Sequence, residues 1–137
     1  MNADQKLRLL VITPEKTALD QTVDSVRFPL ADGQIGILPG RAPLVGRLGF
    51  GELKFVDGQK EQSFFLDGGF VQVKQNTVSI LTARLLELNQ LKVEEAERLL
   101  QEALSRRTAN ETERAAKERD VLRARSMLTL ARKTGAA

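Results

Sequence analysis

Glycine and proline are distributed very unevenly along this chain, and that distribution constrains the fold more than any other feature. All four Pro residues lie before residue 44, and nine of the ten Gly residues lie between positions 33 and 69. Neither residue type occurs between Gly69 and Gly135. Because both residues punctuate turns, we expect a β-rich domain over residues 1–88, followed by a helical domain over residues 89–137.

The first part of the chain contains short apolar runs that are typical of strands. Leu7–Thr13 is almost continuously apolar and ends at Pro14, which predicts a buried strand. A second strand is expected around residues 23–28, closed by Pro29. Frequent turns between short strands indicate an antiparallel sandwich or barrel.

The second half of this β-rich part predicts a hairpin and two further strands. Residues 53–56 and 61–66 form the hairpin, with a type I′-compatible turn at Asp57-Gly58. Asp67-Gly68-Gly69 is expected to break the chain. Residues 70–74 alternate between apolar and polar side chains, Gln75-Asn76 is a candidate turn, and residues 77–81 form the last strand.

The second part predicts two helices joined by a three-residue turn at residues 108–110. Asn110, with Glu113 three residues later, is typical of a helix start. A short connection makes the helices antiparallel neighbours. Each helix carries a narrow apolar stripe: Ala96, Leu99, Leu100, Ala103 and Leu104 in the first, and Val121, Ala124, Leu128 and Ala131 in the second. The expected fold class is therefore α+β, an N-terminal antiparallel β-sandwich followed by a C-terminal antiparallel α-helical hairpin.

Composition weighs against catalysis. The chain has no Cys, His, Trp or Tyr, so it cannot build a Ser–His–Asp triad or any common zinc site. An acid–base pair would need two carboxylates, or a carboxylate and a lysine, and no pattern selects such a pair. We therefore expect no enzyme, no cofactor and no metal.

No apolar run is long enough to cross a membrane as a helix, and the polar start, residues 1–6, does not resemble a secretory signal. We therefore expect a protein that is cytoplasmic or peripheral to the cytoplasmic face of a membrane.

The net positive charge lies entirely in the helical part. Residues 1–88 hold ten basic and ten acidic side chains, whereas residues 89–137 hold eleven basic and eight acidic side chains. The basic side chains of the second helix either face solvent or bind an acidic partner. Nucleic acid fits less well than an acidic protein surface, because acidic residues are interleaved and no aromatic residue follows Phe70.

The segment from Asp32 to Leu44, DGQIGILPGRAPL, lacks the lysine of a phosphate-binding loop, so turn chemistry alone predicts a strand between turns. This string nevertheless resembles the pattern E/D-G-x-x-G-I-L-P-G-H-A-P-L of the epsilon subunits of F-type ATP synthases. Val11-x-Thr13-Pro14-Glu15 is similar to the opening of that family, and the residues from 67 to 81 resemble its S-G-G-F-x-E-V and V-x-I-L strands.

The resemblance implies a ten-stranded β-sandwich with a helical hairpin, in a non-catalytic subunit of the rotor's central stalk. It implies that the protein binds the gamma subunit and the ring of membrane c subunits and helps to couple proton translocation to ATP synthesis. The residues implied to face the c-ring and gamma are Gln34, Ile35, Gly36, Ile37, Leu38, Pro39, Gly40, Arg41, Ala42 and Pro43.

The resemblance also implies that the hairpin can meet an acidic loop of the beta catalytic subunit and restrain ATP hydrolysis. The cations that would make this contact are Arg114, Lys117, Arg119, Arg123 and Arg125. The protein would then be peripheral to the cytoplasmic face of the bacterial inner membrane, with the plastid thylakoid as the other location.

Two departures from the family pattern matter. Arg41 replaces the usual His, which keeps a donor but loses titration near neutral pH. Some bacterial members carry I/L-D-x-x-R-A as part of an ATP site. In this chain Lys92 stands at the Asp position of that motif, and Glu95 stands at its Arg position. Glu102 adds another negative charge on the same helix. We therefore expect no ATP binding below millimolar, and Asn89 as a substitute cap for the first helix.

Two alternatives stay open at this point. One is a free-standing β-sandwich module whose basic hairpin binds an acidic protein or nucleic acid. The other is a small carboxylate-based hydrolase, which the missing pocket residues disfavour.

Overall fold

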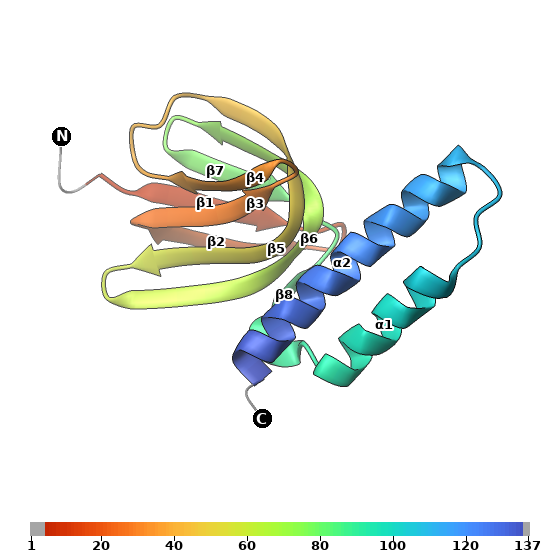
Figure 1. The fold of residues 1–137 in the computed structure, drawn as a ribbon. Helices are drawn as coiled ribbons and strands as arrows, with labels where there is room; N and C mark the ends of the chain where they lie inside the picture. The colour runs from red at the N-terminus through yellow and green to blue at the C-terminus, as the bar shows by residue number, and fades with distance from the viewer. Residues whose placement is uncertain (1–4, 136–137) are drawn as a thin grey trace. The chain divides into compact units, whose positions relative to one another are not determined.

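The computed structural model describes residues 5–135 and divides into two compact units, with the boundary between Leu85 and Leu86. Each unit is built from the element type that its sequence favours (Figure 1). The strands are β1 (Leu7–Ile12), β2 (Thr17–Val23), β3 (Ser25–Leu30), β4 (Gly33–Ile37), β5 (Leu44–Asp57), β6 (Lys60–Lys74), β7 (Thr77–Leu81) and β8 (Leu85–Glu87). The helices are a 3-10 turn, η1 (Leu88–Gln90), and the α-helices α1 (Val93–Ser105) and α2 (Glu111–Gly135).

The strands form one hydrogen-bonded network in the order β2-β1-β7-β6-β5-β3-β4, and β8 pairs with β6. The N-terminal sandwich and the two C-terminal helices confirm the predicted fold class. The expectation that every strand pair is antiparallel is wrong in one place, because β1 and β7 run parallel, with Arg8 opposite Thr77. All the strands from β2 to β6 lie between them in sequence, which supplies the long crossover that parallel pairing requires.

Two long strands connect the layers of the sandwich. β5 has 14 residues and β6 has 15, and Figure 1 shows both curving along their length. The described residues form eight strands rather than the ten implied by the resemblance, because β5 and β6 each run unbroken through the bend.

The sequence predicted a chain break at residues 67–69, but β6 runs through these residues without a break. Gly69 explains why. Its φ is +114°, and a Cβ there would lie 1.8 Å from the carbonyl oxygen of Leu81. The glycine pair therefore allows close approach of β7 at the bend, and the expected chain break is wrong.

The local turns follow the sequence with two corrections. The hairpin of β5 and β6 is confirmed, but its loop is Gly58-Gln59, and Asp57 still pairs with Lys60. Gly58 has a φ of +64°, whereas the φ of Gln59 is not positive. A positive φ at the first loop residue alone fits a type II′ turn rather than a type I′ turn. At the candidate turn between β6 and β7, Gln75 and Asn76 have φ of 51° and 61°, as in a type I′ turn.

The predicted second strand, around residues 23–28, is wrong in its boundaries. Val23 ends β2 and Val26 lies in β3, because the chain turns between them at Asp24. Pro29 does not close the strand. It lies within β3, opposite Gln34 of β4.

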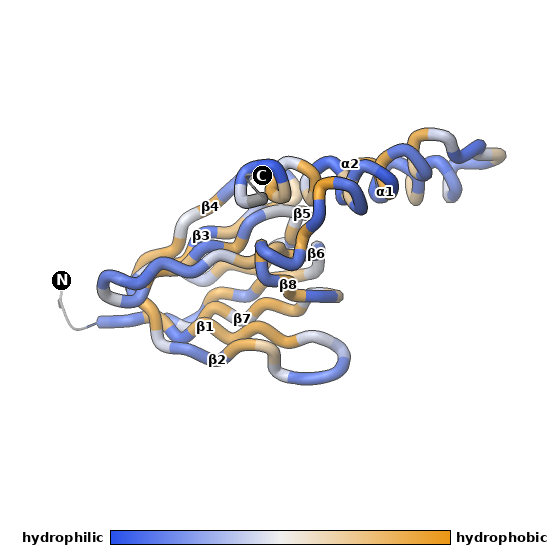
Figure 2. Tube along the Cα trace, turned by 90° about the horizontal axis from the view of Figure 1, so that it is seen from below, coloured by the Kyte–Doolittle hydropathy of each residue, from blue (hydrophilic) through white to orange (hydrophobic). Residues whose placement is uncertain are grey.

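The core of the β unit lies between its layers. Figure 2 shows apolar and polar positions interleaved along the strands. Phe28 and Phe55 are fully buried in this core, and each such side chain contributes about 1.5–3 kcal/mol by leaving water. The Phe55 and Phe64 rings stack with their centroids 5.9 Å apart.

The helical unit contains the expected antiparallel pair. The Asn110 side-chain oxygen accepts the Glu113 amide at 2.9 Å, which confirms the predicted start of α2. In α1 only Ala96 and Ala103 of the predicted stripe are fully buried, and Leu104 is 40% exposed. Ion pairs join the helices at Arg106–Asp120 (2.8 Å) and Arg132–Glu97 (3.5 Å). Within residues 5–135, neither α-helix has the length and apolar character needed to span a membrane.

Candidate functional site

The segment from residue 34 to residue 43 consists of β4 and the loop that follows it. Ile37 is buried at 1% exposure, and Ile35 packs against the core. Because side chains alternate along a strand, Gln34 and Gly36 lie on the outer face and are exposed. The core residues of β4 thus fix the point at which the loop leaves the sheet.

Asn76 holds that loop in place. Its side-chain oxygen accepts the Gly40 amide at 2.8 Å, and its own carbonyl accepts the Arg8 amide at 2.8 Å. The loop also closes on itself, because the Arg41 amide donates to the Leu38 carbonyl at 3.3 Å. The sequence indicated only a turn at Asn76. No local pattern marks a contact with a residue 36 positions away.

Three large apolar side chains on the outer face of the β unit form a surface that we call the apolar patch: Val45, Phe70 and Leu81. They are 76%, 57% and 51% exposed, respectively. Phe70 lies opposite Leu81 on one side and Arg47 on the other. The Arg47 guanidinium lies 6.0 Å from the centre of the Phe70 ring, so a cation borders the patch.

Sequence reasoning did not identify the apolar patch, although one signal for it was present. The alternation over residues 70–74 places Phe70 on the same face as Gln72 and Lys74. An aromatic residue on the polar face of a strand is a sign of an interface rather than of a core.

The five predicted cations of α2 do not lie on one face. Helical spacing places Arg114 and Arg125 on one side, and Arg119 and Arg123 on another. Arg114 pairs with Glu111, and the Lys117 ammonium donates to the Arg106 carbonyl at 3.0 Å. Arg119 and Arg125 are exposed and make no ion pair among residues 5–135, so they are the cations most available to a partner.

The three residues that replace the ATP motif lie on or next to α1. Arg98 lies between Glu95 and Glu102, bonds Glu95, and donates to Glu102 at 2.6 Å. The hydrogen bond from Arg98 holds the pKa of the Glu95 carboxyl below its usual value. Both carboxylates are therefore paired with Arg98 within the helix itself.

Lys92 occupies the N-cap position of α1, which has no side-chain cap bond. Its ammonium donates instead to the Asn89 carbonyl at 3.4 Å. The expectation that Asn89 caps α1 is wrong, because Asn89 lies within η1.

Comparison with known proteins identifies the β unit first. Residues 6–87 match the family model described as ATP synthase, Delta/Epsilon chain, beta-sandwich domain. This match covers more than half of the chain and includes the loop, Asn76 and the apolar patch.

Relatives extend the similarity to the helices. The ATP synthase epsilon chain of Rhodopirellula baltica is 39% identical over 126 residues, which covers 92% of this chain and 98% of the relative. The ATP synthase epsilon chain of Anaeromyxobacter sp. is 35% identical over 91% of this chain and 97% of the relative's length. That of Leptospira borgpetersenii is 49% identical, over 56% of this chain and 61% of its own.

Solved structures share the fold. A chain in the Euglena gracilis mitochondrial ATP synthase (OSCP/F1/c-ring) superposes with a TM-score of 0.81 and 22% identity, over 94% of this chain and 83% of that one. A chain in the Tetrahymena thermophila mitochondrial ATP synthase (central stalk/c-ring) superposes with a TM-score of 0.75 and 17% identity, over 93% of this chain and 98% of that one.

The resemblance drawn from the Gly- and Pro-rich string is thus confirmed over a much longer stretch of the chain. A family model covers most of the β unit, and a relative that overlaps nearly the whole chain is 39% identical. The chain therefore belongs to the family of ATP synthase epsilon chains.

Proposed function

We propose that this protein is the non-catalytic rotor subunit of an F-type ATP synthase and couples proton translocation to ATP synthesis. The observation that carries the proposal is the 39% identity to an ATP synthase epsilon chain over 92% of this chain, because it spans both units. The composition supports a non-catalytic role, since no His or Cys is present. No observation favours the free-standing module or the carboxylate hydrolase.

Residues 1–88 serve, in this proposal, as the foot that attaches to gamma and the c-ring. The loop from residue 34 to residue 43 contacts the c-ring side, held in place by Asn76. The apolar patch binds the gamma subunit. A cluster of exposed apolar side chains bordered by a cation fits a protein interface better than contact with water.

Residues 89–137 serve as the regulatory part, which restrains ATP hydrolysis. The exposed Arg119 and Arg125 meet an acidic surface of the beta catalytic subunit, and Arg114, Lys117 and Arg123 join when their present contacts exchange. Each exposed ion pair contributes about 0.2–1 kcal/mol, so salt should weaken the restraint.

The protein binds no ATP below millimolar in this proposal, because Glu95 and Glu102 place negative charge where phosphates would lie. It is held at the cytoplasmic face of the bacterial inner membrane through the complex. Its partners are the gamma subunit, the c-ring, and the alpha and beta subunits.

Affinity purification of the tagged full chain from its own cells tests the proposal. The wild type should recover the alpha, beta, gamma and c subunits. Phe70→Gln should recover several-fold less. Leu122→Gln, which changes an apolar residue of α2 that is 61% exposed, should match the wild type. Failure of the wild type to recover any of these subunits would overturn the proposal.

A further inference from the structure

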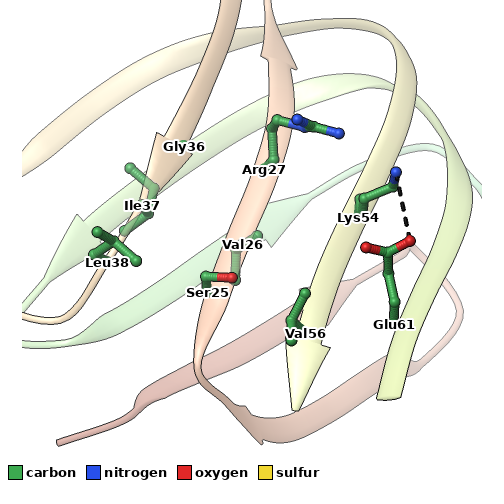
Figure 3. Close-up of a pocket in the computed structure, with 9 residues that line it drawn as sticks. All are labelled: Ser25, Val26, Arg27, Gly36, Ile37, Leu38, Lys54, Val56 and Glu61. Carbon is green, nitrogen blue, oxygen red and sulfur yellow. Dashed lines mark ion pairs between the residues drawn. The ribbon is translucent and has the colours of Figure 1, made fainter. Parts of the chain in front are cut away.

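The outer face of β3, β4 and β5 carries a hollow that shares Gly36, Ile37 and Leu38 with the segment proposed to face the c-ring and extends beyond that segment to Arg27 and Lys54 (Figure 3). It has a volume of roughly 360 Å³. Strand register places Gly36, Arg27 and Lys54 side by side across three strands, because Arg27 lies opposite both of the others. Leu38 and Val56 also line the hollow, together with Ser25 and Glu61.

Gly36 leaves the floor of this hollow bare, and the fold does not require a glycine there. Its φ is not positive, and a Cβ at this position would meet no atom within 4 Å. A glycine inside a strand weakens it relative to alanine. The residue therefore fits a place where a segment from outside approaches the backbone of β4 closely.

The charges around the hollow fit one carboxylate. Arg27 is exposed and makes no ion pair in the described part of the chain. Lys54 lies 3.6 Å from Glu61, beyond ordinary hydrogen-bond length, so its ammonium keeps donors for another acceptor. Two cations and one carboxylate leave a single positive charge, which matches a side-chain carboxylate better than a doubly charged phosphate.

The apolar end of the hollow fits a neighbouring apolar side chain. Leu38 is 63% exposed although it directly follows the core residue Ile37. Figure 3 shows Leu38 near Ile37 and Val56 near the end of β5, on the same side of the sheet as Lys54 and Glu61. Covering Leu38 would remove a large apolar surface from water.

We propose that the hollow over Gly36 receives an extended segment of a neighbouring rotor subunit that carries a carboxylate beside an apolar side chain. The carboxylate accepts hydrogen bonds from Arg27 and Lys54, the apolar side chain covers Leu38 and Val56, and the backbone of the segment passes over Gly36. This inference rests on the proposed function, because the segment belongs to a subunit of the same complex.

Titration of the purified full chain into ATP synthase that has been stripped of this subunit tests the proposal. Gly36→Val fills the hollow and should raise the Kd at least tenfold. Arg27→Gln should raise it several-fold, and Glu61→Gln should lower it, because it removes the competing carboxylate. Controls are Thr22→Val, which places a valine at an exposed strand position outside the hollow, and Lys16→Gln, which removes an exposed cation outside it.

Urea unfolding of the free chain keeps this test separate from misfolding. The midpoint of Gly36→Val should be no lower than that of the wild type, since valine suits a strand and meets no atoms here. A Kd for Gly36→Val and Arg27→Gln within twofold of the wild type would overturn the proposal. If the wild type itself fails to bind the stripped enzyme, the proposed function falls instead.

Carbodiimide crosslinking identifies the occupant. In the complex reconstituted with Glu61→Gln, the Lys54 amine should form an amide with a carboxylate of another rotor subunit, and mass spectrometry locates both residues. Lys54→Arg should abolish the link. A link to a second copy of this chain, or no link, overturns the proposal. So does Arg27-dependent binding of the free chain to vesicles of phosphatidylglycerol.

Discussion

Gly69 shows how a single residue can serve a purpose that its sequence neighbourhood does not reveal. Two adjacent glycines after an aspartate usually indicate a turn, and the sequence predicted one. The structure uses Gly69 for close contact with the Leu81 carbonyl, which lies on another strand. Sequence reasoning identifies requirements within a few residues, such as the Asn110 cap. It cannot identify a requirement that a distant strand imposes.

Replacing Gly69 by alanine should therefore destabilise the protein severely. The new Cβ would need the Leu81 backbone to move, and alanine disfavours the positive φ, so the free energy of unfolding should fall by more than about 2 kcal/mol. Gly36→Ala is the matched control and should change it by less than about 1 kcal/mol. Urea unfolding measures both. A Gly69→Ala protein as stable as the wild type would contradict the described packing.

Asp24 predicts a pH dependence of stability. Its carboxylate accepts the Gly58 amide at 2.6 Å and pairs with Lys6 at 3.1 Å, and these contacts hold its pKa below the usual 3.8. A lowered pKa in the folded state means that the contribution is present above 3.8 and is lost as the pH falls through the folded-state value.

Asp24→Asn should therefore be less stable than the wild type at pH 7, and the gap should close as the pH falls through the folded-state pKa of Asp24. Chemical unfolding across this pH range measures the gap. Asp32→Asn is the control and should run parallel to the wild type. A gap for Asp24→Asn that is independent of pH would show that charge is not its cause.

At the scale of elements, α2 was predicted well as a helix but less well as a binding surface. Its cap and apolar stripe are local patterns, and the structure reproduces them. Its charges are all visible in the sequence. Their partners are not, because Lys117 is engaged by the end of α1. The inhibitory role of these cations stays a prediction.

Reversing the two available cations should release ATP hydrolysis. Arg119→Glu with Arg125→Glu should raise the ATPase rate of the assembled enzyme several-fold at low salt, because two favourable pairs become repulsive. The difference should shrink at high salt. Lys16→Glu with Lys60→Glu makes the same change in net charge in the β unit and should leave the rate unchanged. Equal rates for all three proteins would remove the inhibitory role.

The replaced ATP motif on α1 makes a separate prediction. Calorimetric titration of ATP into the free chain should give no binding below millimolar, because Glu95 and Glu102 repel phosphate and already occupy Arg98. Micromolar binding would contradict this account of the site.

At the scale of the whole molecule, the distribution of Gly and Pro predicted the order of a β part and a helical part. It did not predict the parallel pairing of β1 with β7 or the two bent strands β5 and β6. Those features depend on contacts between residues far apart in the chain, where local propensity carries little information. The site divides in the same way. The loop lies in a contiguous motif, whereas the apolar patch and the hollow are assembled from separate strands.

Proton-driven ATP synthesis by membrane vesicles tests the central claim most directly. Vesicles from cells that lack this chain should synthesise ATP at a small fraction of the normal rate. Adding the purified wild-type chain should restore synthesis, and adding Phe70→Gln should restore much less. ATP synthesis at the full rate without the chain would contradict the claim that this protein couples proton translocation to ATP synthesis.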